Sequence, residues 1–221
     1  MELNLSGLIL YGEFEKFIEL VPEKKEVMIN VADFANNSKV RAKVILRNKD
    51  RDEIIEVSGN QMVSLRAGDR YEIEVSSDQG YAFDSRTLDM NAPEQKALDF
   101  KLQKLELGTK LTLRDINFES NSAKLSDVSF TELERVVKLL VENPTLQVEI
   151  SAHTDDVGSD TYNLILSQKR AQSVVDFLTS NQVVPDRFQA KGYGEKMAKL
   201  PNTSEENRFV NRRVELKIIG I

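Results

Sequence analysis

Apolar and polar residues alternate through the first half of the chain. Alternation at period two places every second side chain on one face of a β-strand. Asn-, Asp- and Gly-containing turn signals separate the alternating segments at a spacing of about 8–12 residues, which is typical of a β-sandwich. We therefore predict an all-β sandwich for residues 1–108, with strands at 27–31, 40–46, 55–57, 63–65, 71–75 and 98–102.

The first 22 residues are ambiguous. Leu3, Leu5, Leu8 and Leu10 could form an additional strand or a tail docked on the sandwich.

The hydrophobic period changes after Gly108. Apolar residues over 111–118 indicate a strand with a kink. Helical spacing follows over 130–140 and again over 163–179, and alternation returns at 146–152 and 214–218. The order β-α-β-α-β with short links predicts a two-layer α/β domain over residues 109–221. The fold class is therefore α+β with two domains.

Both ends of the first predicted helix carry sequence signals. Ser129 and Glu132 have the spacing of a capping box, in which the hydroxyl and the carboxylate satisfy exposed helix N–H groups. Asn143-Pro144 predicts the end of that helix.

Composition excludes several kinds of function. The 221 residues are 40% hydrophobic and 30% charged, so a core can form, and the net charge of −6 argues against a nucleic-acid binder. Cysteine is absent and there is one histidine, so disulfides, zinc–thiolate sites and poly-His metal sites are not expected. No apolar run approaches the ~18 residues of a membrane span. The start has no basic segment before its apolar patch, so we expect no intact export signal and a chain trimmed from a longer protein.

Chemically informative residues gather between the second strand and the second helix of the later half. Asp155 and Asp156 follow the buried strand, at the edge where α/β sheets place ligand sites. Asn163, Ser167 and Arg170 put polar groups on a helix face that should meet the core. Arg170 lies roughly 10 Å from the helix start at 1.5 Å per residue, so its side chain can lean back towards the carboxylates.

An acid and a base on different rigid elements allow two interpretations. Asp155 and Arg170 could form an internal ion pair. Alternatively they could clamp a free amino-acid centre, because a carboxylate accepts from an ammonium and a guanidinium grips a carboxylate. The residues alone leave both open.

The run from Asn163 to Leu178 fits the pattern N-x2-L-S-x2-R-A-x2-V-x3-L without a mismatch. Together with His153-Thr154-Asp155, Phe118 and Asn211-Arg212-Arg213-Val214, it resembles the OmpA-like peptidoglycan-binding domain over about 109–219. Members of that family include outer-membrane protein A, the peptidoglycan-associated lipoprotein and the flagellar stator protein MotB. The resemblance implies non-covalent binding of the diaminopimelate residue of the peptidoglycan stem peptide.

By position, the resemblance implies a role for each matching residue. Asp155 would take the ligand's ammonium and Arg170 its carboxylate, while Asn163 would add a polar contact and orient the loop. The remaining expected ligand-binding residues are Arg212 on the carboxylate side, Thr154 and Asp156 as loop contacts, Asp156 through its backbone, and Phe118 as the first-strand aromatic.

Two residues depart from the family pattern. Ala152 and Asn207 stand where glycine is usual. The second change could reshape the 202–209 loop and affect Arg212.

The first half resembles carboxypeptidase-regulatory (transthyretin-like) sandwiches, which often precede OmpA-like domains in Bacteroidetes envelope proteins. The resemblance rests on the strand pattern and on the segment 63–75. It implies no peptidase, because the first 108 residues contain no histidine and no apparent metal ligands.

Other chemistry has less support. A metal at His153 would need Asp155, Asp156 and water, which is a poor transition-metal set. We expect His153 to hydrogen-bond within its loop and Tyr193 to pack near the site. Asp155 and Asp156 as an acid/base pair lack a nucleophile and an oxyanion arrangement.

The expected function is therefore that of a non-enzymatic envelope anchor, without metal or cofactor, in the periplasm and associated with the outer membrane and cell wall. Peptidoglycan is the expected partner, and other envelope proteins could bind the sandwich. The alternatives are a scaffold in a secretion or motility machine, an interaction module in which Asp155 and Arg170 pair, and a wall-peptide hydrolase.

Overall fold

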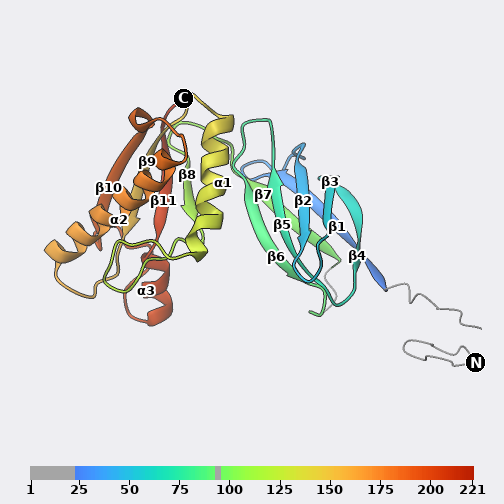
Figure 1. The fold of residues 1–221 in the computed structure, drawn as a ribbon, viewed down its shortest axis with the longest axis horizontal. Helices are drawn as coiled ribbons and strands as arrows, with labels where there is room; N and C mark the ends of the chain where they lie inside the picture. Colours follow the sequence, from blue (N-terminus) through green and yellow to red (C-terminus); the bar gives the residue numbers. More distant parts are fainter. Residues whose placement is uncertain (1–22, 93–95) are drawn as a thin grey trace, which may run out of the picture.

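The computed structural model describes residues 23–92 and 96–221. An all-strand lobe and a mixed helix–strand lobe lie side by side (Figure 1). The segment with Leu3, Leu5, Leu8 and Leu10 falls outside the described residues, so both interpretations of it stay predictions.

The first lobe contains two antiparallel-rich sheets. One has the strand order β4-β1-β7, with β1 parallel to β7, and the other has the order β3-β2-β5-β6. The strands are β1 (Lys24–Asp33), β2 (Lys43–Asn48), β3 (Ile54–Ser58), β4 (Gln61–Arg66), β5 (Arg70–Ser76), β6 (Asp84–Asp89) and β7 (Ala97–Leu102).

A single apolar cluster lies between these sheets. Ile29 and Phe100 from one sheet and Leu46 and Tyr71 from the other are fully buried in it. Because alternate residues of β1, β2, β4, β5 and β7 point into this cluster, the lobe has the two-layer β arrangement that the period-two pattern predicts. Its resemblance to carboxypeptidase-regulatory sandwiches stays a prediction.

Two strands of this lobe differ from the sequence pattern. The pattern missed β6, because Leu88 is its only buried residue and an isolated apolar position gives no alternation. The segment predicted as a strand over 40–46 is a strand only from Lys43, while Val40 joins the fold through its backbone N–H bond to Val31.

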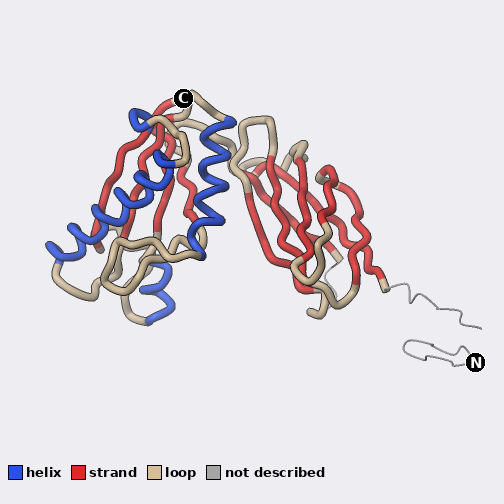
Figure 2. The backbone as a smooth tube through the Cα atoms, viewed as in Figure 1, coloured by secondary structure: helices blue, strands red, loops and turns tan. Residues whose placement is uncertain are grey.

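The second lobe is a four-stranded sheet of order β10-β9-β11-β8 with α1 and α2 packed on one face (Figures 1 and 2). Its elements are β8 (Lys110–Leu113), α1 (Val128–Glu142), β9 (Gln147–His153), α2 (Asp160–Ser180), a 3-10 turn (Pro185–Arg187), β10 (Phe188–Gly194), α3 (Glu205–Asn211) and β11 (Val214–Gly220).

The predicted β-α-β-α-β order is correct but incomplete. It lacks the edge strand β10, whose residues are mostly half-exposed and carry no run of buried apolar side chains. It also lacks α3, which occupies most of the predicted 202–209 loop. The second helix begins at Asp160 rather than 163, because Ser159 caps it by accepting from the Tyr162 N–H.

The predicted capping box is wrong. Helix α1 begins at Val128, and Ser129 and Glu132 both point inward. The Ser129 hydroxyl bonds the Asn117 backbone, and the Glu132 carboxylate accepts from the Arg114 N–H. The turn after β8 needs partners for its buried backbone groups, and these two side chains supply them.

The two lobes contact each other through α1. Ala82 and Leu105 of the first lobe belong to the apolar cluster of the second. Around this contact, Arg135 pairs with Glu72, Lys138 with Glu74 at 3.1 Å and Arg114 with Asp84 at 3.0 Å. The predicted boundary between residues 108 and 109 stays a prediction; it lies within the segment that joins β7 to β8.

Candidate functional site

The loop that follows β9 is held between two neighbouring strands. The His153 N–H donates to the Arg213 carbonyl at 2.9 Å, and the Thr154 N–H donates to the Gly194 carbonyl at 3.0 Å. These bonds continue the hydrogen bonding of β9 from its last residue, His153, to Thr154. The loop therefore presents Asp155 from a fixed backbone.

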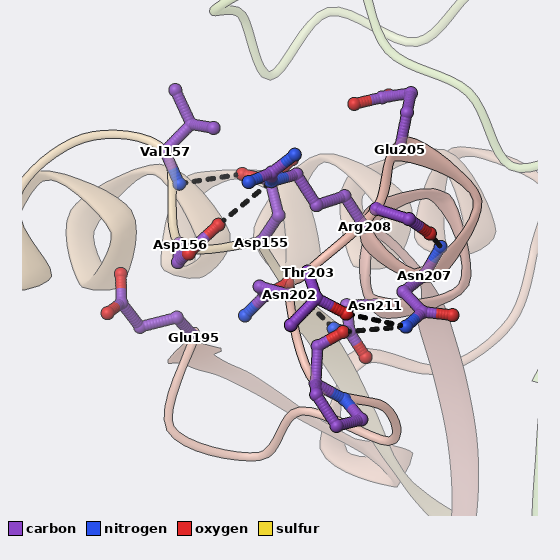
Figure 3. Close-up of polar contacts among 12 residues, drawn as sticks. Asp155, Asp156, Val157, Glu195, Asn202, Thr203, Glu205, Asn207, Arg208 and Asn211 are labelled. Atoms are coloured by element: carbon purple, nitrogen blue, oxygen red, sulfur yellow. Dashed lines mark hydrogen bonds and ion pairs between the residues drawn. The ribbon is translucent and has the colours of Figure 1, made fainter.

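Asp155 is a buried carboxylate, only 7% exposed. One oxygen accepts from the Val157 N–H at 3.1 Å (Figure 3), and the other accepts from Nη1 of Arg212 at 2.7 Å. The predicted alternative of an Asp155–Arg170 ion pair is absent among the described residues, because Arg212 occupies that place. A carboxylate has about four acceptor positions, so Asp155 keeps acceptor capacity.

Arg170 reaches from α2 towards the same region without pairing with a carboxylate. Its Nε donates to the Ser122 carbonyl at 3.0 Å, and its guanidinium carbon lies 4.9 Å from the ring centroid of Phe118. Within the described ranges, neither terminal guanidinium nitrogen has a hydrogen-bond partner. Burial lowers the pKa of Arg170, and nearby Asp155 opposes that effect. The Nε side of the guanidinium is therefore fixed by the Ser122 carbonyl, while the two terminal nitrogens have no partner in the described chain.

Arg212 is engaged on both terminal nitrogens. Besides Asp155, it contacts Glu205 at 2.6 Å through Nη2. Burial acts to lower the pKa of Arg212, but the two carboxylates outweigh it and raise the pKa. Arg170 and Arg212 both line a cavity of about 100 Å³, together with Phe118 and Phe209.

Two buried polar residues of α2 hold the loop and the adjacent strand. Asn163 Nδ2 donates to the Asp155 carbonyl at 3.2 Å and to Glu195 at 2.6 Å. The Ser167 hydroxyl accepts from the Gly194 N–H at 2.8 Å. These contacts explain why polar residues occupy the core-facing side of this helix, as the spacing indicated.

The Asp156 side chain points towards α3, where it accepts from Arg208 Nε at 3.1 Å (Figure 3). The Asn207 side chain donates to the Pro201 carbonyl. Asn207 lies in the first turn of α3, and Arg212, which follows that helix, still donates to Asp155. The presence of Asn207 in place of the usual glycine therefore does not prevent this contact. Ala152, the other departure from the family pattern, is a buried core residue of β9.

The sequence Asn211-Arg212-Arg213-Val214 has a distinct role at each position. Asn211 is fully buried and bonds the backbone of Lys199 and Leu200, which fixes the preceding loop. Arg213 pairs with Glu215 at 2.7 Å, and Val214 packs in the core.

The prediction that His153 hydrogen-bonds within its loop is wrong for its side chain. Neither ring nitrogen has a partner within the described ranges, and the ring stacks on Tyr193 with centroids 5.3 Å apart. Burial, followed by the positive field of Arg213, lowers the pKa of His153 to about 4, so the ring is neutral near pH 7. The buried Thr154 hydroxyl is also without a hydrogen-bond partner among the described residues.

Sequence reasoning missed the residues that hold the candidate ligand-binding side chains. Glu205, Arg208 and Glu195 engage Arg212, Asp156 and Asn163 respectively. One signal was readable: Ser204 followed by two glutamates is a helix start, and Ser204 does accept from the Asn207 N–H. The partner of each charge depends on tertiary placement and had no local signal.

Residues 117–212 match the model of the OmpA family. The chain contains an OmpA-family domain. Outer membrane porin F of Pseudomonas fluorescens is 36% identical over 104 residues, covering 47% of this chain and 32% of that protein. Outer membrane protein A of Escherichia coli O157:H7 is 34% identical over 129 residues, covering 52% of this chain and 37% of that protein. The chain therefore spans about a third of the length of these curated relatives.

Solved structures similar to the chain include the peptidoglycan-associated lipoprotein from Burkholderia pseudomallei, at 27% identity and a TM-score of 0.44, covering 47% of this chain and 87% of that one. The cell wall anchor of the T6SS from Pseudomonas aeruginosa is 31% identical with a TM-score of 0.43, covering 51% of this chain and 80% of that one.

OmpA-like domains are peptidoglycan-associated anchors. The OmpA-like family and the family of the peptidoglycan-associated lipoprotein are non-enzymatic. No helix in the described part of the chain is both long enough and apolar enough to cross a membrane.

Proposed function

We propose that the OmpA-family domain binds peptidoglycan non-covalently by holding the diaminopimelate residue of the stem peptide between Arg170 and Asp155. The observation that carries the proposal is the state of Arg170. It is a largely buried guanidinium, oriented by Ser122 and Phe118, with its terminal nitrogens open. A buried cation without an anion is costly, and a ligand carboxylate would compensate it.

The ammonium of the same amino-acid centre would bind Asp155. That carboxylate already bonds Arg212 and the Val157 N–H, so the ammonium adds a third partner or displaces Arg212. Both modes leave the Asp155 carboxylate with a cationic partner. Asn163 supports the arrangement by fixing the Asp155 carbonyl.

The other predicted contacts take secondary roles in this proposal. Thr154 offers an unpartnered hydroxyl, and Phe118 holds the Arg170 guanidinium over its ring. Asp156 is left with its backbone, because its side chain pairs with Arg208. Arg212 contributes positive charge on the carboxylate side.

Recognition at one site is an equilibrium. Charge-assisted hydrogen bonds contribute about 1.5–3 kcal/mol each. Removing one partner of a desolvated pair costs about 2–5 kcal/mol. Many stem peptides on one polymer then retain the protein by avidity.

The test is co-sedimentation of the purified chain with insoluble peptidoglycan. Arg170→Ala and Asp155→Ala should each weaken retention by at least about tenfold. Lys169→Ala, an exposed neighbour on the same helix, is the matched control. Wild-type retention of both site variants would refute the site.

A stem peptide that contains diaminopimelate tests the chemistry. It should compete for wall binding, while the same peptide with lysine in place of diaminopimelate should compete far less, because within a peptide lysine keeps a side-chain ammonium but no free carboxylate beside it. Equal competition by the two peptides would contradict diaminopimelate recognition.

The cellular setting follows from the same proposal. The chain would act in the periplasm, associated with the outer membrane and cell wall, and anchor an envelope protein or complex. The first lobe, residues 1–108 in the predicted division, would be the part that contacts other envelope proteins.

A further inference from the structure

The face of the second sheet that points away from α1 and α2 carries a second, polar cavity of about 450 Å³. Alternate residues of β9 and β11 form its floor, including Ser151, His153 and Glu215. The loop that contains Lys196 and Lys199 forms a wall. This basic cavity shares His153 and Arg213 with the smaller cavity beside Phe118 and Arg170, and its other lining residues are distinct.

Positive charge predominates around the basic cavity. Lys110, Lys196, Lys199, Arg213 and Lys217 line it, against the two carboxylates Glu149 and Glu215. The chain as a whole has a net charge of −6, so this concentration runs against its overall balance.

The two carboxylates are already engaged. Glu215 accepts from Lys199 at 2.8 Å and from Arg213 at 2.7 Å. Glu149 accepts from the Tyr193 hydroxyl at 3.0 Å and has Lys191 at 4.0 Å.

Three lysines of the basic cavity are left without a carboxylate. Lys110, Lys196 and Lys217 make no ion pair with any residue of the described ranges, and each comes from a different segment. Lys110 and Lys217 are direct partners across β8 and β11, and Lys196 belongs to the loop that forms the wall.

The floor holds a polar group that is also unpartnered. His153 is 4% exposed, and both of its ring nitrogens lack a hydrogen-bond partner in the described chain. As a neutral imidazole it offers one N–H donor and one acceptor. Burial is the main cause that lowers the pKa of His153, Arg213 adds to it, and Glu215, whose carboxylate lies 3.8 Å from Nε2, opposes it.

We propose that the basic cavity binds a phosphate-bearing anion through Lys110, Lys196 and Lys217, with His153 in the same cavity floor. Phosphate fits better than carboxylate because the open cations are ammonium groups, which act as point charges on multivalent anions. The one guanidinium present cannot offer a free fork. Arg213 spends its three nitrogens on Glu215, the Asn211 carbonyl and the Met197 carbonyl.

The test is titration of the full chain with pyrophosphate at constant ionic strength, followed by NMR. The single histidine gives one imidazole signal, and Ser151, which lines the basic cavity but not the smaller one beside Arg170, gives the signal that distinguishes the two. Pyrophosphate should shift the signals of His153 and Ser151, and chloride should not. Lys110→Ala/Lys217→Ala should weaken binding by at least about tenfold.

Lys39→Ala/Lys169→Ala removes the same charge from exposed positions outside the cavity and should leave pyrophosphate binding unchanged. Arg170→Ala should also bind pyrophosphate normally, which separates this inference from the wall-binding proposal. Failure of pyrophosphate to shift His153 beyond the chloride control, or equal binding by the cavity variant, would overturn the inference.

A vesicle arm distinguishes the source of the phosphate. Binding to phosphatidylglycerol vesicles but not to phosphatidylcholine vesicles, lost in the cavity variant, would identify a lipid headgroup. Pyrophosphate binding without vesicle binding would identify a free phosphate compound. Vesicle binding without pyrophosphate binding would contradict the inference, since the same lysines must bind both.

Discussion

Arg212 links the candidate wall-binding site to a residue outside the predicted set. It joins buried Asp155 to Glu205, whose side chain is 68% exposed. The Glu205 carboxylate sits on a guanidinium edge that a ligand carboxylate could use. Glu205 is therefore an internal competitor for an anionic ligand.

Replacing Glu205 with Gln should strengthen peptidoglycan binding by about two- to fivefold, the range that an exposed ion pair of about 0.4–1 kcal/mol allows. Co-sedimentation over a range of wall concentrations measures the change. Glu134→Gln, an exposed residue of α1, makes the same charge change elsewhere. Weaker binding of the Glu205 variant would mean that the ion pair positions Arg212 rather than competing.

His153 should make stability depend on pH. Its pKa is about 4 in the fold and about 6.5 when unfolded, so the unfolded chain binds more protons between these values. The contribution of neutral His153 to the free energy of unfolding is complete above pH 6.5 and is lost as the pH falls towards 4. The loss amounts to about 3 kcal/mol at most.

Urea unfolding of wild type and His153→Gln at pH 7 and pH 4.5 isolates that contribution from the carboxylates. The loss between the two pH values should be smaller in the variant. An imidazole that titrates near 6.5 in the folded chain would contradict the assignment.

At this scale the sequence predicted which side chains approach the site but not how they pair. Asp155 at a strand end and Arg170 two turns into a helix were readable from spacing. The Asp155–Arg212 pair joins residues 57 positions apart, and its geometry depends on α3, which the pattern did not predict.

Contact between α2 and β10 depends on a small residue. A Cβ on Gly192 would lie 2.2 Å from the Gln168 backbone nitrogen and 2.6 Å from the Ser167 hydroxyl. A Cβ at this position would push the α2 backbone away from β10. The strand therefore needs glycine here, whose side chain is a single hydrogen atom.

Gly192→Ala should therefore cost about 3 kcal/mol or more in the free energy of unfolding, at the upper end of overpacking effects. Thermal or urea unfolding measures it. Gln189→Ala, at an exposed position of the same strand, should change stability by less than about 0.5 kcal/mol. Similar stability of the two variants would show that α2 and β10 can separate without loss.

Elements with strong periodicity were predicted well, and weak ones were missed. Helix α1 and strands β1 and β5 bury regular apolar faces. Strands β6 and β10 lie at sheet edges and bury few side chains, so tertiary hydrogen bonding, not hydrophobic pattern, decides their conformation.

The two lobes are coupled through Arg135. This side chain, 15% exposed, pairs with Glu72 in the first lobe and with Glu132 in its own helix. Removing it would leave the buried Glu132 carboxylate without a cation and would break the link to Glu72, which would keep Lys49 at 3.2 Å.

Arg135→Ala should destabilise the second lobe by about 2–4 kcal/mol and separate the unfolding of the two lobes in calorimetry. Lys169→Ala should unfold as wild type does. One unchanged transition in both variants would show that the apolar contact alone couples the lobes.

Overall charge does not describe each face of the molecule. A net charge of −6 argues against binding to an extended polyanion, yet it says nothing about a single face. The lysines of the basic cavity come from segments up to a hundred residues apart, and only the fold collects them.

The arrangement of β8 has a mechanical consequence. Residues Leu113, Val214 and Ala152 lie side by side next to the wall-binding loop, while Lys110 and Lys217 lie at the other end of the β8–β11 ladder. The chain enters β8 at Lys110, so if the proposed site binds peptidoglycan, tension between the polymer and the first lobe would run lengthwise along these strands. Their hydrogen bonds, perpendicular to the pull, would then be sheared together instead of being unzipped one at a time. In the proposed function, this strand order would resist load at which a peeled edge strand would yield.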